Sequence, residues 1–208
     1  MIGIIDYHLN NLRSVQKAFE KVGAESFISD QPEALAGADK LVLPGVGAFG
    51  KAMDNLRTLG LDAVIRRSVG EGKPLLGICL GMQLLFTRSD EGGSFDGFDF
   101  IRGEIKQFPS TVKVPHIGWN QIDIRRDAPL LRAVTDHSFV YFVHSYYAVP
   151  EEDVALCTTD YALPFTSVVQ KENISGIQFH PEKSQTTGLR MLANFAGVGD
   201  RHAVIGAL

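Results

Sequence analysis

The chain has 208 residues, 45% of them hydrophobic, and its 20 basic and 24 acidic side chains give a net charge of −4. A chain of this size can bury a large core without disulfides or metals, so we expect one domain spanning residues 1–208. No block of Lys and Arg and no apolar run near the ~18 residues of a membrane span occurs, which argues against nucleic acid and membranes as partners.

The first half of the chain alternates short apolar runs with helical patterns. Apolar residues recur at intervals of three, four and three from Leu12 to Val22, which is the spacing of one helix face. Runs that are apolar throughout, such as 74–78, are typical of parallel strands covered by helices on both faces. We predict strands over 2–5, 40–43 and 74–78, and helices over 12–22 and 49–69.

The second half is richer in strand-like runs. We predict strands over 101–108, 139–143, 154–159, 165–170 and 174–179, and a closing helix over 188–196. The sequence therefore predicts an α/β fold with a central, mostly parallel sheet flanked by helices and extra antiparallel strands in the second half.

Cys79 lies between an apolar strand pattern and a helical one, with glycines two residues before and two after it. A lone cysteine in an apolar run is usually a buried small hydrophobe. Gly-x-Cys-x-Gly has instead the form of a nucleophile elbow, in which glycines make room for a sharp strand-to-helix turn. The helix N-terminus favours a thiolate, and the N–H of Leu80 would face a developing oxyanion.

A thiolate nucleophile needs a base, and the second half of the chain offers one. A predicted strand leads to His180, and Pro181 fixes an extended step, so that His180 and Glu182 can project to the same side. A histidine near an acidic residue is more often a surface pair. Together with the elbow, however, this pair predicts a triad of Cys79, His180 and Glu182.

A third motif is the strand at 41–43 that runs into the glycine-rich loop Gly45-Val46-Gly47. A phosphate-binding loop is the rival interpretation, but no Gly-Lys-Ser/Thr follows. A loop that presents backbone N–H groups to an oxyanion fits better.

The other histidines and the second cysteine predict no further reactive centre. We interpret His144, inside an apolar run, as a hydrogen-bonded residue of the core or near the site, His116 as a residue on the substrate side, and Cys157 as buried packing. Two cysteines are too few for a disulfide framework, and zinc-ligand spacing is absent. We therefore expect no metal and a reducing, cytoplasmic setting.

These motifs together resemble the class I, triad-type glutamine amidotransferases, in the expected order and over nearly the whole chain. The resemblance rests on Gly-Ile-Cys-Leu-Gly-Met-Gln at 77–83, Pro-Gly-Val-Gly at 44–47 and Gln-Phe-His-Pro-Glu-Lys-Ser at 178–184. More narrowly, the chain resembles the subfamily of glutaminase subunits that serve imidazole glycerol phosphate synthases, through the segments at 11–15, 114–120 and 141–146.

The resemblance implies a reaction. Cys79 would attack the side-chain amide of glutamine, His180 would protonate the departing ammonia and then activate water, and Glu182 would hold the imidazole. The loop from Gly45 to Gly47 would give a second oxyanion donor once a peptide rearranges on engagement of a partner. No cofactor is implied. The resemblance also assigns the glutamine contacts to Gln83, Glu91, Ser145 and Tyr146.

A partner is expected because ammonia released into bulk water would be protonated and lost, and 208 residues leave no room for a synthase domain. The resemblance implies a heterodimer with a cyclase subunit, a TIM barrel that makes imidazole glycerol phosphate and aminoimidazole carboxamide ribotide in histidine biosynthesis. Aromatic and long cationic residues often anchor interfaces, which makes Trp119, Tyr141 and Lys183 candidates. Core packing or a solvated charge is an equal alternative for each.

Three other functions are considered. A paralogous glutaminase could supply ammonia to a different synthase, such as one for surface-sugar amidation. A cysteine hydrolase with a similar elbow would act without a partner. A non-catalytic module with the same fold is disfavoured because Cys79, His180 and Glu182 are all present.

Overall fold

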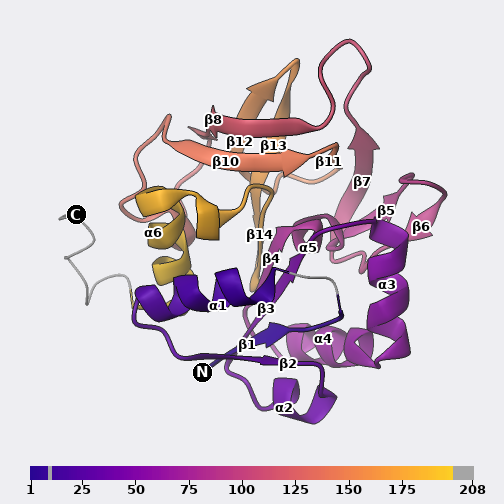
Figure 1. Ribbon diagram of the computed structural model, residues 1–208, viewed down its shortest axis with the longest axis vertical. Coiled ribbons are helices and arrows are strands. Elements are labelled where there is room, and N and C mark those ends of the chain that lie inside the picture. Colours follow the sequence, from indigo (N-terminus) through magenta and orange to yellow (C-terminus); the bar gives the residue numbers. More distant parts are fainter. Residues whose placement is uncertain (9–10, 199–208) are drawn as a thin grey trace.

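The computed structural model describes residues 1–8 and 11–198, which fold around one large sheet (Figure 1). In this part of the chain, β12 (Ala155–Tyr161) pairs with β13 (Leu163–Lys171) and with β9 (Asp123–Ile124), and a separate ribbon pairs β8 (His116–Gln121) with β10 (Phe139–His144). The large sheet runs through β2 (Ser26–Ser29), β1 (Ile2–Ile5), β3 (Lys40–Gly45), β4 (Leu75–Cys79), β14 (Ile174–Ile177), β13 (Leu163–Lys171), β11 (Tyr146–Pro150), β7 (Ile101–Gln107), β5 (Phe86–Ser89) and β6 (Phe95–Asp96).

The two halves of the sheet differ in strand direction. From β2 to β14 every neighbouring pair is parallel, whereas β13 pairs antiparallel with β14, β11 and β12. The predicted fold class is confirmed: the sheet is mostly parallel in its first half, and antiparallel strands extend it in the second.

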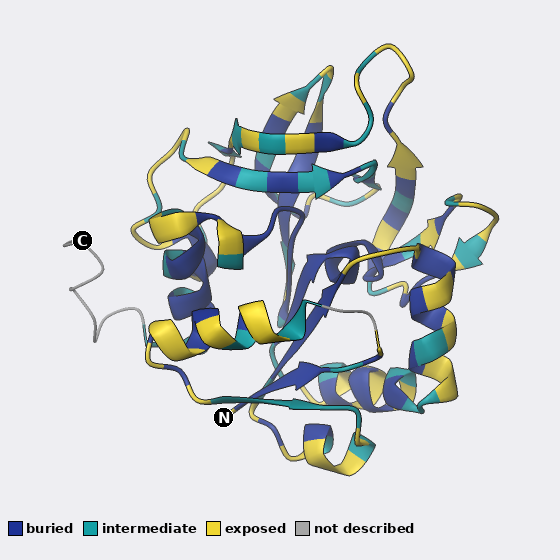
Figure 2. Cartoon of the chain, viewed as in Figure 1, coloured by how far each residue is buried: buried dark blue, intermediate teal, exposed yellow. Residues whose placement is uncertain are grey.

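Helices cover both faces of the parallel half. Successive residues of a strand point to opposite faces, and Val42 accordingly packs in one core cluster while Leu41 and Leu43 pack in the other. Figure 2 shows the central strands buried throughout. The first cluster includes α1 (Leu12–Lys21) and α6 (Gln185–Ala196), and the second includes α2 (Pro32–Ala36), α3 (Phe49–Thr58) and α4 (Leu61–Gly70).

One predicted helix is wrong in its extent. The stretch from 49 to 69 forms two helices, α3 and α4, instead of one. Gly60 separates them with a φ of 67°, a left-handed conformation that ends a helix and that glycine adopts at little cost. Among the described residues, no helix has the length and apolar character needed to cross a membrane.

Candidate active site

Cys79 stands on a sharp turn between a strand and a helix. It is the last residue of β4 and directly precedes the short helix α5 (Leu80–Gln83), with φ 55° and ψ −112°. A side chain at Gly77 would lie 2.6 Å from the carbonyl oxygen of Gly81, and one at Gly81 would overlap the carbonyl oxygen of Leu43. The two glycines are therefore sterically required for the strained conformation that presents the thiol.

His180 and Glu182 reach the same edge of the sheet from the neighbouring strand. β14 pairs in parallel with β4, Ile177 opposite Ile78, so the chain beyond both strands emerges at one edge. A 3₁₀ turn, η2 (Pro181–Lys183), follows His180. Nδ1 of His180 lies 2.8 Å from Oε1 of Glu182, and both side chains are buried.

The electrostatics of the pair favour a protonated ring. Burial lowers the pKa of His180, but the charges of Cys79 and Glu182 and the hydrogen bond with Glu182 outweigh burial and raise it to about 10. By geometry, Nε2 has no hydrogen-bond partner within the described ranges. Since Nδ1 is held by Glu182, Nε2 is the nitrogen left to exchange a proton with a reacting group.

Asn11 completes the surroundings of Glu182. Its Nδ2 donates a hydrogen bond of 2.5 Å to Oε1, the same oxygen that binds His180. Asn11 stands at the N-cap of α1, yet its side chain makes no capping hydrogen bond. The side chain that would ordinarily stabilise the helix end is thus turned toward the carboxylate.

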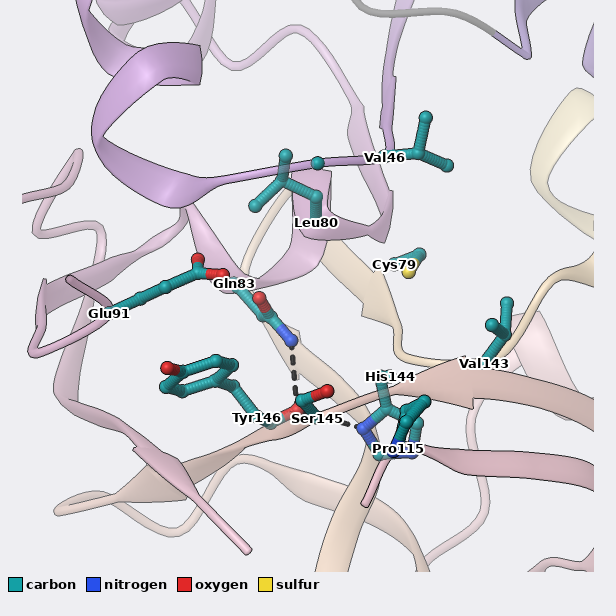
Figure 3. Close-up of a pocket in the computed structure, with 11 residues that line it drawn as sticks. Val46, Cys79, Leu80, Gln83, Glu91, Pro115, Val143, His144, Ser145 and Tyr146 are labelled. Carbon is teal, nitrogen blue, oxygen red and sulfur yellow. Dashed lines mark hydrogen bonds between the residues drawn. The ribbon is translucent and has the colours of Figure 1, made fainter.

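A cavity of about 310 Å³ opens beside Cys79 (Figure 3). Eight of the eleven lining residues are predicted site residues, so the structure brings the elbow, the loop predicted to bind an oxyanion and the residues predicted to contact glutamine around one space. Gly45, His180 and Glu182 do not line it. The lining is Val46, Gly47, Cys79, Leu80, Gln83, Glu91, Pro115, Val143, His144, Ser145 and Tyr146.

Gly45 lies behind the cavity, directly opposite Cys79 in the β3–β4 register. The hydroxyl of the fully buried Tyr7 occupies the place where a side chain at position 45 would stand. Burial, followed by the charge of Cys79, raises the pKa of Tyr7. Tyr7 is therefore neutral, and its hydroxyl has no hydrogen-bond partner in the described part of the chain.

Two of the residues predicted to contact glutamine, Gln83 and Glu91, already make hydrogen bonds within the protein. Nε2 of Gln83 donates to the carbonyl of Tyr146 and to Oε1 of Gln178, each at 3.0 Å, so both its amide hydrogens are used. Oε2 of Glu91 accepts the N–H of Phe49 at 2.8 Å, at the first turn of α3, where a negative charge is favourable.

A buried histidine pair supports the cavity wall. Nδ1 of His144 lies 2.8 Å from the carbonyl of Tyr146 and must donate to it, so Nε2 of His144 accepts from Nδ1 of His116 at 3.1 Å. Burial lowers the pKa of His116 to about 4 and that of His144 to about 3, which keeps both neutral. His144 lines the cavity, whereas the expectation for His116 is wrong: it packs behind His144 and is not among the lining residues.

The three interface candidates lie together on the ribbon side of the site. Trp119 of β8 is opposite Tyr141 of β10, their rings 5.9 Å apart, and Nζ of Lys183 lies 5.9 Å from the Tyr141 ring. Trp119 remains 47% exposed. The cluster is neither core packing nor a set of isolated solvated side chains.

One group of side chains has donor atoms close enough to hold a metal ion. Within residues 1–8 and 11–198, ligand atoms of Asp123, Asp136 and His137 lie within 4.8 Å of one another. Nδ1 of His137 is hydrogen-bonded to Asp123, and Oδ1 of Asp136 accepts two backbone N–H groups. These bonds already satisfy the group at the surface. Cys157 is fully buried, as predicted.

A family model and curated relatives decide the affiliation of the chain. The model described as "Glutamine amidotransferase class-I" matches residues 3–197. The chain belongs to this family. A curated class-I relative, "Imidazole glycerol phosphate synthase subunit HisH" from Syntrophotalea carbinolica, is 53% identical over 203 residues, covering 94% of this chain and 98% of its own. The protein of the same description from Aquifex aeolicus is 52% identical over 194 residues, covering 92% and 94%.

Solved structures share the class-I amidotransferase fold. A crystal structure described as a glutamine amidotransferase matches with a TM-score of 0.75 at 17% identity, over 95% of this chain and 99% of that one. The structure of PurLQS from Thermotoga maritima matches with a TM-score of 0.72 at 18% identity, over 97% of both chains. At these identities the likeness concerns the fold alone.

Sequence reasoning missed two residues of this class-I site. Asn11 carried a helix-cap signal and nothing that pointed to Glu182. Gln178 belongs to the Gln-Phe-His-Pro-Glu motif, but its amide pattern, with Oε1 toward Gln83 and Nε2 3.9 Å from Sγ of Cys79, depends on the folded arrangement.

Proposed function

We propose that this protein hydrolyses glutamine to glutamate and ammonia, and passes the ammonia to the cyclase subunit of an imidazole glycerol phosphate synthase in histidine biosynthesis. The observation that carries the proposal is the strained Cys79 at a cavity wall beside a buried His180–Glu182 pair. The curated relatives, about half identical over nearly their full length, are subunits of that synthase. They favour this function over a synthase for surface-sugar amidation.

Acylation begins with the thiolate of Cys79, which adds to the side-chain carbonyl carbon of glutamine. The negative charge moves to the carbonyl oxygen, and the N–H of Leu80 and a backbone N–H of the loop Gly45-Val46-Gly47 stabilise it. The imidazolium of His180 gives its Nε2 proton to the amide nitrogen. The carbon–nitrogen bond breaks, ammonia leaves, and a γ-glutamyl thioester remains on Cys79.

Deacylation uses the same groups in reverse. Neutral His180 takes a proton from water, and the hydroxide adds to the thioester carbon. The carbon–sulfur bond then breaks, glutamate is released and Cys79 returns as a thiolate. Glu182 holds Nδ1 of His180 throughout, which fixes the ring and stabilises its charged form.

Substrate recognition follows from the cavity lining. Glu91 provides a carboxylate suited to the α-amino group of glutamine, and the backbone around Ser145 and Tyr146 suits its α-carboxylate. Gln83 contributes through its amide oxygen, because its hydrogens already bind Tyr146 and Gln178.

The partner in this proposal is a TIM-barrel cyclase that forms a heterodimer over Trp119, Tyr141 and Lys183. The exposed Trp119 and the cation beside an aromatic ring are the kinds of group that anchor interfaces. We place the reaction in the cytoplasm, because Cys79 must stay reduced and both cysteines are unpaired.

The test is glutamate release from glutamine by the purified protein, alone and with a cognate cyclase subunit and its nucleotide ligand. We expect low activity alone, a large rise with the liganded cyclase, and loss of both in Cys79→Ala. Full activity without any partner would favour an independent cysteine hydrolase. Activation by a different synthase alone would retain the glutaminase but overturn the pathway.

A further inference from the structure

Gln178 is a fully buried amide beside the nucleophile that the triad and the oxyanion donors leave unused. It lies between β14 and His180, and its side chain is inaccessible to solvent. Its Nε2 is 3.9 Å from Sγ of Cys79, within the range of an N–H···S hydrogen bond, and its Oε1 is 3.0 Å from Nε2 of Gln83.

The hydrogen bonds of Gln83 and Tyr146 fix the orientation of the Gln178 amide. The carbonyl of Tyr146 can only accept, and Nε2 of Gln83 donates to it at 3.0 Å. The same nitrogen of Gln83 faces Gln178, so the Gln178 atom that meets it must be the oxygen. The NH₂ group of Gln178 is therefore the end that faces Cys79.

His144 strengthens this assignment. Its Nδ1–H is the second donor to the Tyr146 carbonyl, and its Nε2 is occupied by His116. His116 thus donates to His144, and His144 donates to the carbonyl of Tyr146 on β11, the same carbonyl that accepts from Gln83. A reversed Gln178 would set two NH₂ groups against each other inside the core, which is costly.

We propose that Gln178 is a catalytic residue that donates an N–H hydrogen bond to the sulfur of Cys79 and stabilises its thiolate form. This inference rests on the proposed function, which makes that thiolate the nucleophile. Hydrogen bonding to a charged acceptor favours the charged form.

The role of Gln178 differs from that of His180. An amide cannot give up its proton, so Gln178 stays a donor after His180 has passed its proton to ammonia. It is therefore available when Cys79 departs from the thioester as a thiolate, the step in which negative charge returns to sulfur.

The experiment measures alkylation of Cys79 by iodoacetamide as a function of pH in the purified full chain. The sulfur displaces iodide and forms a carbon–sulfur bond, and peptide mass spectrometry separates Cys79 from the fully buried Cys157. The variants are Gln178→Met, which loses the donor, and Gln178→Glu, which keeps an acceptor toward Gln83 but places a carboxyl oxygen at the sulfur. The matched control is Gln170→Met, a partly buried glutamine on the adjacent strand β13.

We expect Gln178→Met to raise the pH at half-maximal alkylation by about one unit, and to slow the reaction about tenfold at pH values below that midpoint, since a hydrogen bond to a charged group has this effect. Gln178→Glu should have the larger shift, because its carboxylate repels the thiolate. Gln170→Met should keep the wild-type profile.

An unchanged pH profile of Cys79 alkylation in folded Gln178 variants would overturn the role of Gln178. A lower melting temperature without a shift in that profile would overturn it as well. The two failures are separable. If glutamate release persists in Cys79→Ala, the proposed function is wrong, whatever the alkylation profile; if it is lost while the Gln178 variants alkylate like wild type, only this inference falls.

Discussion

The backbone of Tyr141 is bonded to the turn that carries His180. The N–H of His180 donates to the carbonyl of Tyr141 at 3.0 Å, and the N–H of Tyr141 donates to Oγ of Ser184 at 3.0 Å. Ser184 in turn donates its hydroxyl to the carbonyl of His180 at 2.6 Å. The strand β10, which carries Tyr141, and the turn that carries His180 thus form one hydrogen-bonded unit.

Ser184→Ala tests this unit. Loss of the hydroxyl leaves the Tyr141 N–H and the His180 carbonyl without their buried partner, so we expect a stability loss of about 1–2 kcal/mol and a smaller activation by the cyclase. Denaturant unfolding and glutamate release with and without the cyclase measure the two effects. Ser138→Ala, at a half-buried serine whose hydroxyl bonds to the carbonyl of Thr135 outside this unit, is the control. Activation equal to wild type would show that the unit does not transmit partner binding.

Asn11→Asp tests the support of Glu182. The substitution replaces the N–H donor at Oε1 by an oxygen that repels it, so Glu182 loses the hydrogen bond from residue 11 and is held less firmly beside Nδ1 of His180. We expect kcat/KM for glutamine to fall at least about tenfold, with little change in KM. Gln16→Glu, the same kind of exchange at a half-buried amide of α1 that does not contact the triad, should retain activity. If kcat/KM fell only because KM rose, with kcat unchanged, a role of Asn11 at the triad would be contradicted.

Gly81→Ala tests the elbow. A methyl group there overlaps the carbonyl of Leu43, and relief requires movement of β3 or α5, so we expect a loss of at least about 3 kcal/mol or failure to fold. Gly70→Ala, where a methyl group meets nothing within 4 Å, should be neutral or slightly stabilising. Thermal unfolding of the two variants gives the comparison, and equal melting temperatures would refute the steric account.

The pair of His116 and His144 makes the fold sensitive to acid. Burial lowers their pKa values to about 4 and about 3, whereas in the unfolded chain they bind protons near pH 6.5. Their contribution to stability is therefore present above about pH 6.5 and is lost as the pH falls toward 4. At pH 5 the loss amounts to about 2 kcal/mol for each histidine.

Denaturant unfolding at pH 7.5 and pH 5 measures this loss. The double variant His116→Asn, His144→Gln should lose less stability between the two pH values than the wild type. His180, whose pKa is raised, is present in both proteins and cancels in the difference. An equal loss in both proteins would show that the buried pair does not govern acid sensitivity.

The sequence predicts the elements whose residues are uniformly apolar or strictly periodic. Strands such as β1 and β4 are buried at every position, and their boundaries differ from the prediction by at most a residue. Strand β2, Ser26–Ser29, is half-buried throughout, and its sequence Ser-Phe-Ile-Ser places two apolar residues side by side, so it has neither a uniformly apolar run nor a period of two. Gly60 was a visible signal for the break between α3 and α4.

The site residues also fall into those that a local sequence pattern predicts and those that it does not. Cys79, His180 and Glu182 stand in local patterns whose geometry follows from adjacent glycines and proline, and the structure brings them together. The contacts of Asn11 and Gln178 span 171 and 99 residues of chain, and only the packing of α1 on the sheet and the pairing of β14 with β4 set them. Such long-range hydrogen bonds have no local signature.

The side chain of Tyr7 and any side chain at position 45 would occupy the same space, which limits the order in which the two residues can be substituted. The tyrosine hydroxyl fills the space that a side chain at position 45 would need, and Cζ of Tyr7 would lie 3.1 Å from it. Substitution of Gly45 first therefore meets a clash, whereas a shorter residue at position 7 first leaves a void that a later side chain at 45 can fill. A mutational path that enlarges the residue opposite Cys79 must begin at the tyrosine.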